Sequence, residues 1–353
     1  MYRIAVIPGD GIGKEVMPES IRVLEAVGKR FGIKFEWQSF PWGCEYYMSK
    51  GEMMPKNGLD ILKNFDAILL GAVGFPGVPD HVSLWGLLIP IRRTFQQYVN
   101  LRPVRLLKGI TSPLRDKKES DIDFYVVREN NEGEYSNVGG MMYPGTEQEM
   151  VIQESIFTRR GVEKVMRFSF ELTKTRTHKH LTSATKSNGI IYTMPYWDKI
   201  FKELSKEYPE VKTDQYHIDG LTTKLVLEPE RFDVIVASNL LGDIISDLGP
   251  ALAGSLGIAP SANLNPEKDY PSMFEPVHGS APDIFGKGIA NPIGQIWSGA
   301  MMLDHLGHAE AASVIEESFE KVIADKNKRT PDLGGKATTE EIGRAIAETV
   351  SVS

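Results

Sequence analysis

Near its start the chain reads Ile4-Ala5-Val6-Ile7-Pro8-Gly9-Asp10-Gly11-Ile12-Gly13. Four consecutive apolar residues that end at turn residues predict a short, buried strand. Apolar residues at helical spacing then run through residues 14–30, so a helix follows the turn directly. A buried strand that leads through a tight turn into a helix is a unit from which parallel sheets are built. The first thirty residues therefore predict an α/β protein.

The alternation of strand and helix continues along most of the chain. Further helical patterns lie near residues 159–175, 192–205 and 240–256. Strand-like runs occur between and before them, at residues 33–40, 66–70, 99–106, 123–127, 181–184, 215–218 and 233–237. This order predicts a largely parallel sheet with helices packed against it.

The C-terminal part of the chain and one internal stretch depart from this alternation. From residue 291 onward only helical patterns remain, at about 292–306, 309–325 and 339–350. Thr338 with Glu341 predicts a capping box at the start of the last helix. We expect this helical block to pack onto the sheet of the first domain. Residues 137–145 are rich in turn residues and predict a hairpin, an exposed arm or a surface loop.

Size and composition exclude several classes of protein. The 353 residues predict about two domains. A net charge of −7 without a basic stripe argues against nucleic-acid binding. No apolar run approaches the ~20 residues that cross a bilayer, and the N-terminus has no signal-peptide core. Cys44 is the single cysteine, which excludes an intramolecular disulfide and favours a reducing compartment. We therefore expect a cytoplasmic protein with no membrane or nucleic-acid partner.

The glycine-rich turn at residues 9–13 is a poor match to a dinucleotide-binding fingerprint. Its spacing is G-x-G-x-G, and no acidic residue stands cleanly at the end of the next strand. The preferred interpretation is a tight structural turn, with phosphate binding as the alternative.

Three arginines stand at the ends of predicted elements. Arg102 lies at the start of one strand-like run, Arg128 ends another, and Arg92 lies shortly before the first of them. Ligands of α/β proteins bind at strand ends, and guanidinium groups suit carboxylates and phosphates. The three arginines therefore indicate an anion site, although each alone is also typical of a surface ion pair.

A pair of aspartates follows the strand at residues 233–237. In Asn239-Leu240-Leu241-Gly242-Asp243-Ile244-Ile245-Ser246-Asp247, the two carboxylates are four residues apart and share one face of the predicted helix. A hard divalent cation would relieve their repulsion. The alternative is the ordinary preference of aspartate for the first turn of a helix.

A long loop of small residues precedes the first C-terminal helix. It begins Glu275-Pro276-Val277-His278-Gly279-Ser280-Ala281-Pro282-Asp283 and leads to Asn291. Such a loop lets backbone amides approach phosphate or adenosine closely, and Asp283 would bind a ribose diol and repel a 2′-phosphate. Lys186, just after a strand, and Tyr135 are candidate acids or bases, although each alone is typical of the surface.

Together these motifs resemble the β-decarboxylating dehydrogenases, a family that includes isocitrate, 3-isopropylmalate, homoisocitrate and tartrate/D-malate dehydrogenases. The resemblance runs over essentially the whole chain, and the motifs at 239–247 and 275–283 are its most specific parts. It implies an isopropylmalate-dehydrogenase-like two-domain α/β fold, not a true Rossmann fold. Residues 1–97 and 249–353 would form a large domain with the nucleotide loop. Residues 98–248 would form a smaller domain with the subunit interface and the catalytic residues.

The resemblance also implies roles for individual residues. Asp243 and Asp247, with Asp219 of a neighbouring subunit, would bind Mg²⁺ or Mn²⁺. A monovalent cation is a further cofactor that the resemblance allows. Lys186, also from the neighbour, would be the general base, and Tyr135 the general acid. The protein would thus be a homo-oligomer, at least a dimer, with shared active sites.

The substrate and the coenzyme would bind to two further sets of residues. Arg92, Arg102 and Arg128 would hold the substrate carboxylate at C4. NAD, rather than NADP, would bind to the loop residues Glu275, His278, Gly279, Ser280, Ala281, Asp283, Ile284 and Asn291.

The segment before Arg92 discriminates among substrates. Its Ser83-Leu84-Trp85-Gly86 run resembles the tartrate/D-malate branch, whereas Leu88 occupies the position of an apolar substrate contact in isopropylmalate enzymes. We therefore predict NAD-dependent oxidative decarboxylation of D-malate to pyruvate and CO₂, tartrate oxidation, or both. The first alternative is 3-isopropylmalate dehydrogenase. The second is a non-catalytic regulatory subunit, which the presence of all five catalytic and metal residues disfavours.

Overall fold

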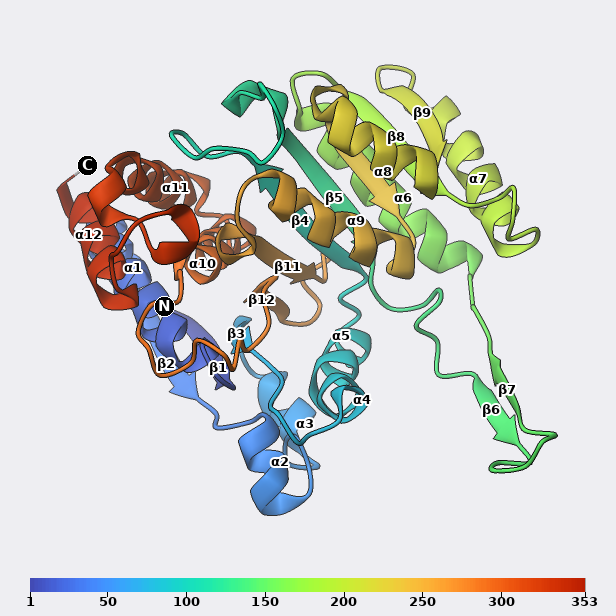
Figure 1. The fold of residues 1–353 in the computed structure, drawn as a ribbon, viewed down its shortest axis with the longest axis horizontal. Helices are drawn as coiled ribbons and strands as arrows, with labels where there is room; N and C mark the ends of the chain where they lie inside the picture. The colour runs from blue at the N-terminus through green and yellow to red at the C-terminus, as the bar shows by residue number, and fades with distance from the viewer. Residues whose placement is uncertain (353) are drawn as a thin grey trace.

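The computed structural model describes residues 1–352 and contains one large central sheet (Figure 1). Its ten strands lie in the order β2-β1-β3-β12-β11-β4-β5-β10-β8-β9. In chain order they are β1 (Tyr2–Gly9), β2 (Phe35–Ser39), β3 (Ala67–Ala72), β4 (Val99–Arg105), β5 (Asp123–Glu129), β8 (His180–Thr185), β9 (Lys212–His217), β10 (Val234–Ala237), β11 (Pro260–Leu264) and β12 (Ser272–Pro276).

Strand direction divides this sheet into two parallel parts. Strands β2, β1, β3 and β12 pair in parallel, and so do β5, β10, β8 and β9. The antiparallel pairs are β12–β11, β11–β4 and β4–β5 in the middle. The expected α/β class and the largely parallel sheet are confirmed, and the strand order differs from that of a dinucleotide-binding Rossmann sheet.

Helices cover both parts of the sheet. On the N-terminal part, α1 (Gly13–Phe31) and α10 (Ile293–His305) pack against strands, and α11 (Ala309–Ala324) and α12 (Thr339–Val352) pack chiefly against α1, α10 and each other. The other part carries α6 (Arg159–Thr175), α7 (Thr193–Leu204), α8 (Ile218–Leu227) and α9 (Asn239–Leu252). Short helices lie between β2 and β4, namely α2 (Cys44–Lys50), α3 (Gly58–Leu62), α4 (Asp80–Ser83) and α5 (Ile89–Thr94), with a π-helical turn at Leu84–Leu88.

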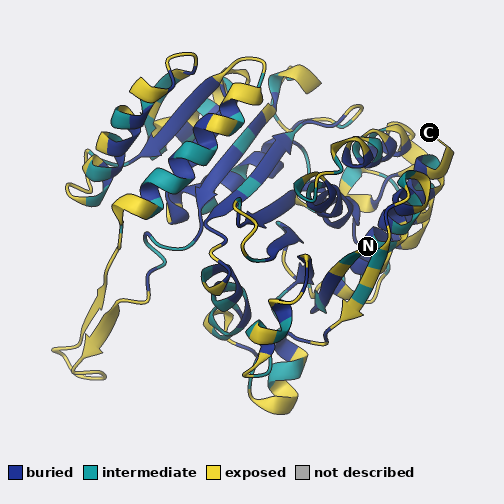
Figure 2. Cartoon of the chain, turned by 180° about the vertical axis from the view of Figure 1, so that it is seen from behind, coloured by how far each residue is buried: buried dark blue, intermediate teal, exposed yellow. Residues whose placement is uncertain are grey.

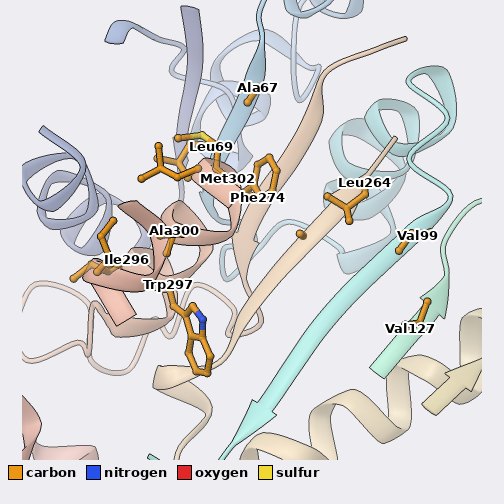
Figure 3. Packing of buried hydrophobic residues seen from close by; sticks show 14 of the residues in the cluster. Ala67, Leu69, Val99, Val127, Leu264, Phe274, Ile296, Trp297, Ala300 and Met302 are labelled. Atoms are coloured by element: carbon orange, nitrogen blue, oxygen red, sulfur yellow. The ribbon is translucent and has the colours of Figure 1, made fainter. Parts of the chain in front are cut away.

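Of the C-terminal helices, α10 packs onto the sheet as the sequence predicts, whereas α11 and α12 pack chiefly against α10, α1 and each other. Figure 3 shows members of one buried cluster, in which Ile296, Trp297, Ala300 and Met302 come from α10, Leu69 from β3, Phe274 from β12 and Leu264 from β11. The capping box at the start of α12 is present, since the amide of Thr338 donates to Glu341 and the amide of Glu341 donates to the Thr338 hydroxyl. All six residues of β3 are buried, and Figure 2 shows the central strands as buried. The domain boundaries at 97/98 and 248/249 stay a prediction.

Residues 137–145 form part of an exposed arm. Strands β6 (Gly139–Met142) and β7 (Met150–Gln153) pair as an antiparallel hairpin that projects from the body of the molecule (Figures 1 and 2). The arm exposes large apolar side chains, including Met141, Tyr143 and Val151. Within residues 1–352, none of the helices is long and apolar enough to cross a bilayer, and the cytoplasmic location stays a prediction.

Candidate active site

A polar cluster lies where β4 and β5 face helix α9 (Figure 1). Arg102 on β4 donates from Nη1 to the Ser246 hydroxyl at 2.7 Å and to Asp247 Oδ1 at 3.1 Å. Arg128 at the end of β5 donates from Nη1 to Asp243 Oδ1 at 2.6 Å. Two of the predicted arginines and both predicted helix carboxylates therefore lie together.

Gly242 allows Arg128 to lie this close to α9. A Cβ added at Gly242 would lie 2.6 Å from Cγ and 2.7 Å from Cβ of Arg128, which is closer than side chains approach each other. The guanidinium also donates to the Asn239 side chain at 2.8 Å. Burial lowers the pKa of Arg128 to about 10, which leaves the group charged at neutral pH.

Arg92 brings a third guanidinium into the same region. Its Nη2 atom lies 2.8 Å from Oε1 of Glu275 on β12, and both side chains are largely buried. The Nε atoms of Arg92 and Arg102 are buried and have no hydrogen-bond partner in the structure. Buried N–H groups are normally paired, so these orphaned donors fit an anionic ligand.

Electrostatics hold Asp243 ionised. Burial opposes its ionisation, but Arg128 and Arg102 together with a hydrogen bond from Tyr135 keep its pKa below the usual value. Asp247 is different: burial raises its pKa in spite of Arg102. Its side chain nevertheless remains 64% exposed, so it is accessible to a ligand.

Tyr135 lies against Asp243 with its proton retained. Its hydroxyl donates to Asp243 Oδ2 at 2.7 Å. Burial and this hydrogen bond raise the pKa of Tyr135 to about 12. A phenol that stays protonated at neutral pH beside an anion site is suited to donate a proton.

Lys186 and Asp219 form a separate ion pair. Lys186 directly follows β8, and Asp219 lies in the first turn of α8. Lys186 Nζ lies 2.7 Å from Asp219 Oδ1, and the lysine holds the pKa of this exposed carboxyl below its usual value. Across the part of the chain that the structure describes, no hydrogen bond or ion pair joins this pair to Asp243, Asp247 or Tyr135. Nor does any group of three or more His, Cys, Asp and Glu side chains within residues 1–352 lie close enough together to hold a metal ion.

The donor chemistry of the aspartates fits a hard divalent cation. Asp243 and Asp247 project from one helix beside each other, and both offer carboxylate oxygens, which Mg²⁺ and Mn²⁺ prefer. The structure thus brings together two of the three predicted ligands in one chain. The sequence prediction assigned the third ligand, Asp219, to a neighbouring subunit.

The predicted nucleotide loop lines a pocket of about 580 Å³. Residues 279–282 form one wall, and residues 73–80 form the other. Nε2 of His278, at the start of this loop, is buried without a hydrogen-bond partner.

The other predicted coenzyme residues lie around this loop or away from it. The Asn291 side chain donates to Asp332 at 3.0 Å. Ile284 packs over Ile12 and Val16 in a small apolar cluster under the loop, and Asp283 is exposed. Glu275, by contrast, lies beside Arg92 and Asn263.

The glycine-rich turn supports this loop by packing. The amide of Ile12 donates to the Ser280 carbonyl at 2.9 Å. A Cβ at Gly11, whose φ is +50°, would lie 2.1 Å from that same carbonyl oxygen. These contacts agree with the preferred interpretation of a structural turn.

Arg93, which none of the sequence motifs indicates, links two parts of the site. Its guanidinium lies 4.9 Å from the ring of Trp85 and donates to the backbone carbonyl of Tyr135 at 2.7 Å. Leu88, the predicted apolar contact, is half-buried at the end of the π-helical turn. The only signal for Arg93 in the sequence is its position next to Arg92.

Glu129, a buried carboxylate next to Arg128 in the sequence, should make the stability of the fold depend on pH. Its carboxylate accepts hydrogen bonds from the amides of Asn131 and Glu132, yet burial raises its pKa to about 7. The folded protein therefore binds a proton more tightly than the unfolded chain, for which the pKa is about 4.3. This contribution to stability is complete below pH ~4.3 and is lost as the pH rises through about 7.

We expect Glu129→Gln to remove this pH dependence. The free energy of unfolding of the variant, relative to the natural chain, should rise by roughly 3 kcal/mol between pH 4.5 and pH 8. Denaturant unfolding at fixed protein concentration across this range measures the effect. Parallel curves for the two proteins would contradict the assignment.

The chain resembles known proteins over its whole length. Residues 3–346 match the family model described as isocitrate/isopropylmalate dehydrogenase. The chain is 58% identical over 355 residues to the D-malate dehydrogenase [decarboxylating] of Escherichia coli (strain K12), covering 99% of this chain and 98% of that protein. It is 57% identical over 358 residues to the tartrate dehydrogenase/decarboxylase of Pseudomonas putida, with the same coverage of 99% and 98%.

A solved structure shows the same fold. The crystal structure of isocitrate dehydrogenase from Methylococcus capsulatus superposes with a TM-score of 0.89 at 33% sequence identity, covering 99% of this chain and 100% of that chain. The family and fold expected from the sequence motifs are therefore confirmed.

Proposed function

Because this chain belongs to the isocitrate/isopropylmalate dehydrogenase family, we propose that it catalyses the NAD-dependent oxidative decarboxylation of a 2-hydroxy dicarboxylic acid, with D-malate and tartrate as its substrates. The observation that carries the proposal is the set of three buried arginines around Asp243 and Tyr135, two of which keep an unpaired Nε–H. Such donors suit a dicarboxylate. The names of the two most similar relatives described above support D-malate and tartrate.

Each of the proposed site residues would have its own role in the reaction. Arg92, Arg102 and Arg128 would bind the carboxylate at C4 and hold the substrate against Tyr135. Lys186 of a neighbouring subunit would take the proton of the C2 hydroxyl as the C2 hydride leaves for the nicotinamide. Loss of CO₂ would then leave an enol or enolate, and Tyr135 would donate its proton at C3. The raised pKa of Tyr135 supports this acid role.

The metal would be held by carboxylates of two chains. Asp243 and Asp247, with Asp219 of a neighbouring subunit, would bind Mg²⁺ or Mn²⁺, which acts as a Lewis acid toward the substrate oxygens. The coenzyme would bind in the pocket between residues 73–80 and 279–282. The proposal also includes a monovalent cation as a further cofactor, which rests on the sequence resemblance alone.

Exposed apolar residues support a homo-oligomer. Tyr192, Ile191 and Leu227 are 83%, 66% and 62% exposed, and they lie near Lys186 or on α8. Ile244 and Leu240 on α9 are exposed as well. Exposed apolar residues that gather on a surface mark interaction sites, and these residues lie on the segments that carry both halves of the proposed composite site, near Lys186 and Asp219 and on α9.

The test is a comparison of kcat/KM for NADH formation with Mn²⁺ on D-malate, L-tartrate, 3-isopropylmalate and isocitrate. We expect D-malate or L-tartrate to be preferred. A preference for 3-isopropylmalate would overturn the substrate assignment and indicate that Leu88 outweighs Trp85. Binding of NADH without turnover of any of the four would favour the non-catalytic alternative.

Replacing Asp283 with lysine should weaken the use of NAD. The carboxylate is expected to accept hydrogen bonds from the adenosine ribose, and hydrogen bonds to a charged group contribute roughly 1.5–3 kcal/mol. KM for NAD should therefore rise about tenfold or more, with little change in kcat. Asp269→Lys makes the same charge change at another exposed loop position and serves as the control. An unchanged KM for NAD would refute the ribose contact.

A further inference from the structure

The segment that joins Arg128 to Tyr135 contains three glutamates, Glu129, Glu132 and Glu134. We propose that Glu134 is a positioning residue, which sets the Tyr135 hydroxyl against Asp243 by tying the tyrosine segment to the first turn of α9. This inference rests on the proposed function, because it assigns to Glu134 the placement of the proposed acid.

Glu134 caps a helix from a distant segment. Its Oε1 accepts a hydrogen bond from the Ser238 hydroxyl at 2.7 Å, and its Oε2 accepts one from the amide of Leu240 at 3.1 Å. Ser238 stands at the N-cap position of α9, but its own side chain makes no capping hydrogen bond. The first amides of a helix need acceptors, and a carboxylate is favoured there. Glu134 therefore supplies the capping acceptor that the Ser238 side chain does not.

The same two segments meet again one helical turn later. Tyr135 is the next residue after Glu134, and its hydroxyl donates to Asp243 Oδ2 at 2.7 Å. Asp243 follows Leu240 by three residues on α9. The two links hold the tyrosine segment and the helix at two neighbouring points. Without the Glu134 link, the nearest remaining tie of the segment to α9 before Tyr135 is the hydrogen bond from the Asn239 side chain to the Glu132 carbonyl, three residues away. The Tyr135 hydroxyl itself must release its proton during turnover.

The other two glutamates bind elsewhere. Glu129 accepts chiefly from amides within the segment itself, at Asn131 and Glu132, and its contact with α9 is a long one of 3.5 Å from the Asn239 side chain. Glu132 accepts from the amide and the hydroxyl of Thr158, at 2.8 Å each, where α6 begins. Of the three side chains, Glu134 is the one that accepts from a backbone amide of α9, the helix that carries Asp243 and Asp247. Glu132 therefore offers a matched control: its carboxylate also accepts two hydrogen bonds at a helix N-terminus, but at a helix that carries no proposed site residue.

The experiment compares Glu134→Ala, Glu134→Gln and Glu132→Ala in the full-length enzyme with Mn²⁺, NAD and the substrate that the natural chain prefers. A misplacement of about 1 Å in a reacting group costs about 100-fold in rate. We expect Glu134→Ala to lower kcat by about that factor, with KM for substrate and NAD within about threefold. Glutamine can accept from the Leu240 amide and donate to the Ser238 hydroxyl. The kcat of Glu134→Gln should therefore be at least about tenfold higher than that of Glu134→Ala.

The control separates positioning from stability. Glu132→Ala should lower the melting temperature about as much as Glu134→Ala but leave kcat within about threefold. If kcat of Glu134→Ala stays within threefold of the natural chain, or if Glu132→Ala loses as much activity, the proposal is overturned. Should Glu134→Ala not fold, Ser238→Ala removes one of the two hydrogen bonds. It should lower kcat severalfold, and an unchanged kcat would also overturn the proposal.

The outcome is distinguishable from a failure of the proposed function. If the natural chain oxidises neither D-malate nor L-tartrate but turns over another of the four substrates, the substrate assignment fails and the Glu134 comparison is made with that substrate. If the natural chain is active and Glu134→Ala matches it, only the positioning role fails.

Discussion

Replacing Lys186 with methionine should lower kcat on D-malate by a factor of about 10³ or more while leaving NADH binding nearly unchanged. General base catalysis by a positioned side chain contributes typically 10²–10⁴-fold. Methionine has a similar length and fills the same space, so the change removes the amine and little else. Lys186 is partly exposed and paired with Asp219, and the proposed nucleotide pocket lies in another part of the chain.

Two measurements make this prediction specific. Steady-state NADH formation with Mn²⁺ gives kcat, and fluorescence titration gives the dissociation constant for NADH. Lys199→Met removes another exposed lysine, from helix α7, and should behave like the natural chain. Retention of more than about a tenth of kcat by Lys186→Met would remove Lys186 from the mechanism. A parallel loss of NADH binding would point instead to a disturbed fold.

Local patterns predict those parts of the fold in which each element buries an apolar face of its own. The run at residues 4–7 lies within β1, and the periodic segment at 14–30 matches α1 to within one residue at each end. Strand β3 is buried along its whole length, as a continuous apolar run indicates. The capping box of α12 also follows from neighbouring residues alone.

The strands β11 and β12 escape prediction because of polar residues that the fold buries. Ser261 and Asn263 on β11 point to Asn100 of β4, whose side chain donates to both, and Asn263 donates to Glu275 on β12. These partners are paired in the core, but Asn100 lies more than 160 residues away in the sequence. A polar residue inside a strand looks like a surface position until its partner is known. No local pattern could reveal this network.

The candidate site shows the same division. The rule that ligands bind at strand ends predicts an anion site at Arg102 and Arg128, and helical spacing separately predicts a metal site at Asp243 and Asp247. The structure places these four side chains in contact. Arg93 and Glu134 escaped because each also bonds to a backbone group, at Tyr135 and Leu240, which carries no side-chain signature, and because the side-chain partner of Glu134, Ser238, is distant in the sequence. Site residues that act through the backbone need the folded chain to be found.

Mixing two inactive variants should restore activity if the active site is shared between subunits. Lys186→Met and Tyr135→Phe are each expected to be nearly inactive. The structure places Tyr135 with Asp243, and Lys186 with Asp219, as two separately bonded groups. In a two-fold dimer, a site built from Tyr135 of one chain and Lys186 of the other would be intact once in every mixed dimer. After random exchange half of the dimers are mixed, so about a quarter of the natural activity should return.

A site contained in one chain predicts the opposite result, because every site of a mixed dimer would then lack either the lysine or the tyrosine hydroxyl. Exchange is demonstrated by native mass spectrometry of one tagged and one untagged chain, and the activity is measured on the same sample. Absence of recovery after proven exchange would count against shared sites and, with them, against Asp219 as a metal ligand from the neighbour. Recovery near a quarter would show that two chains pair and that each active site takes residues from both, since chains that do not pair cannot complement each other.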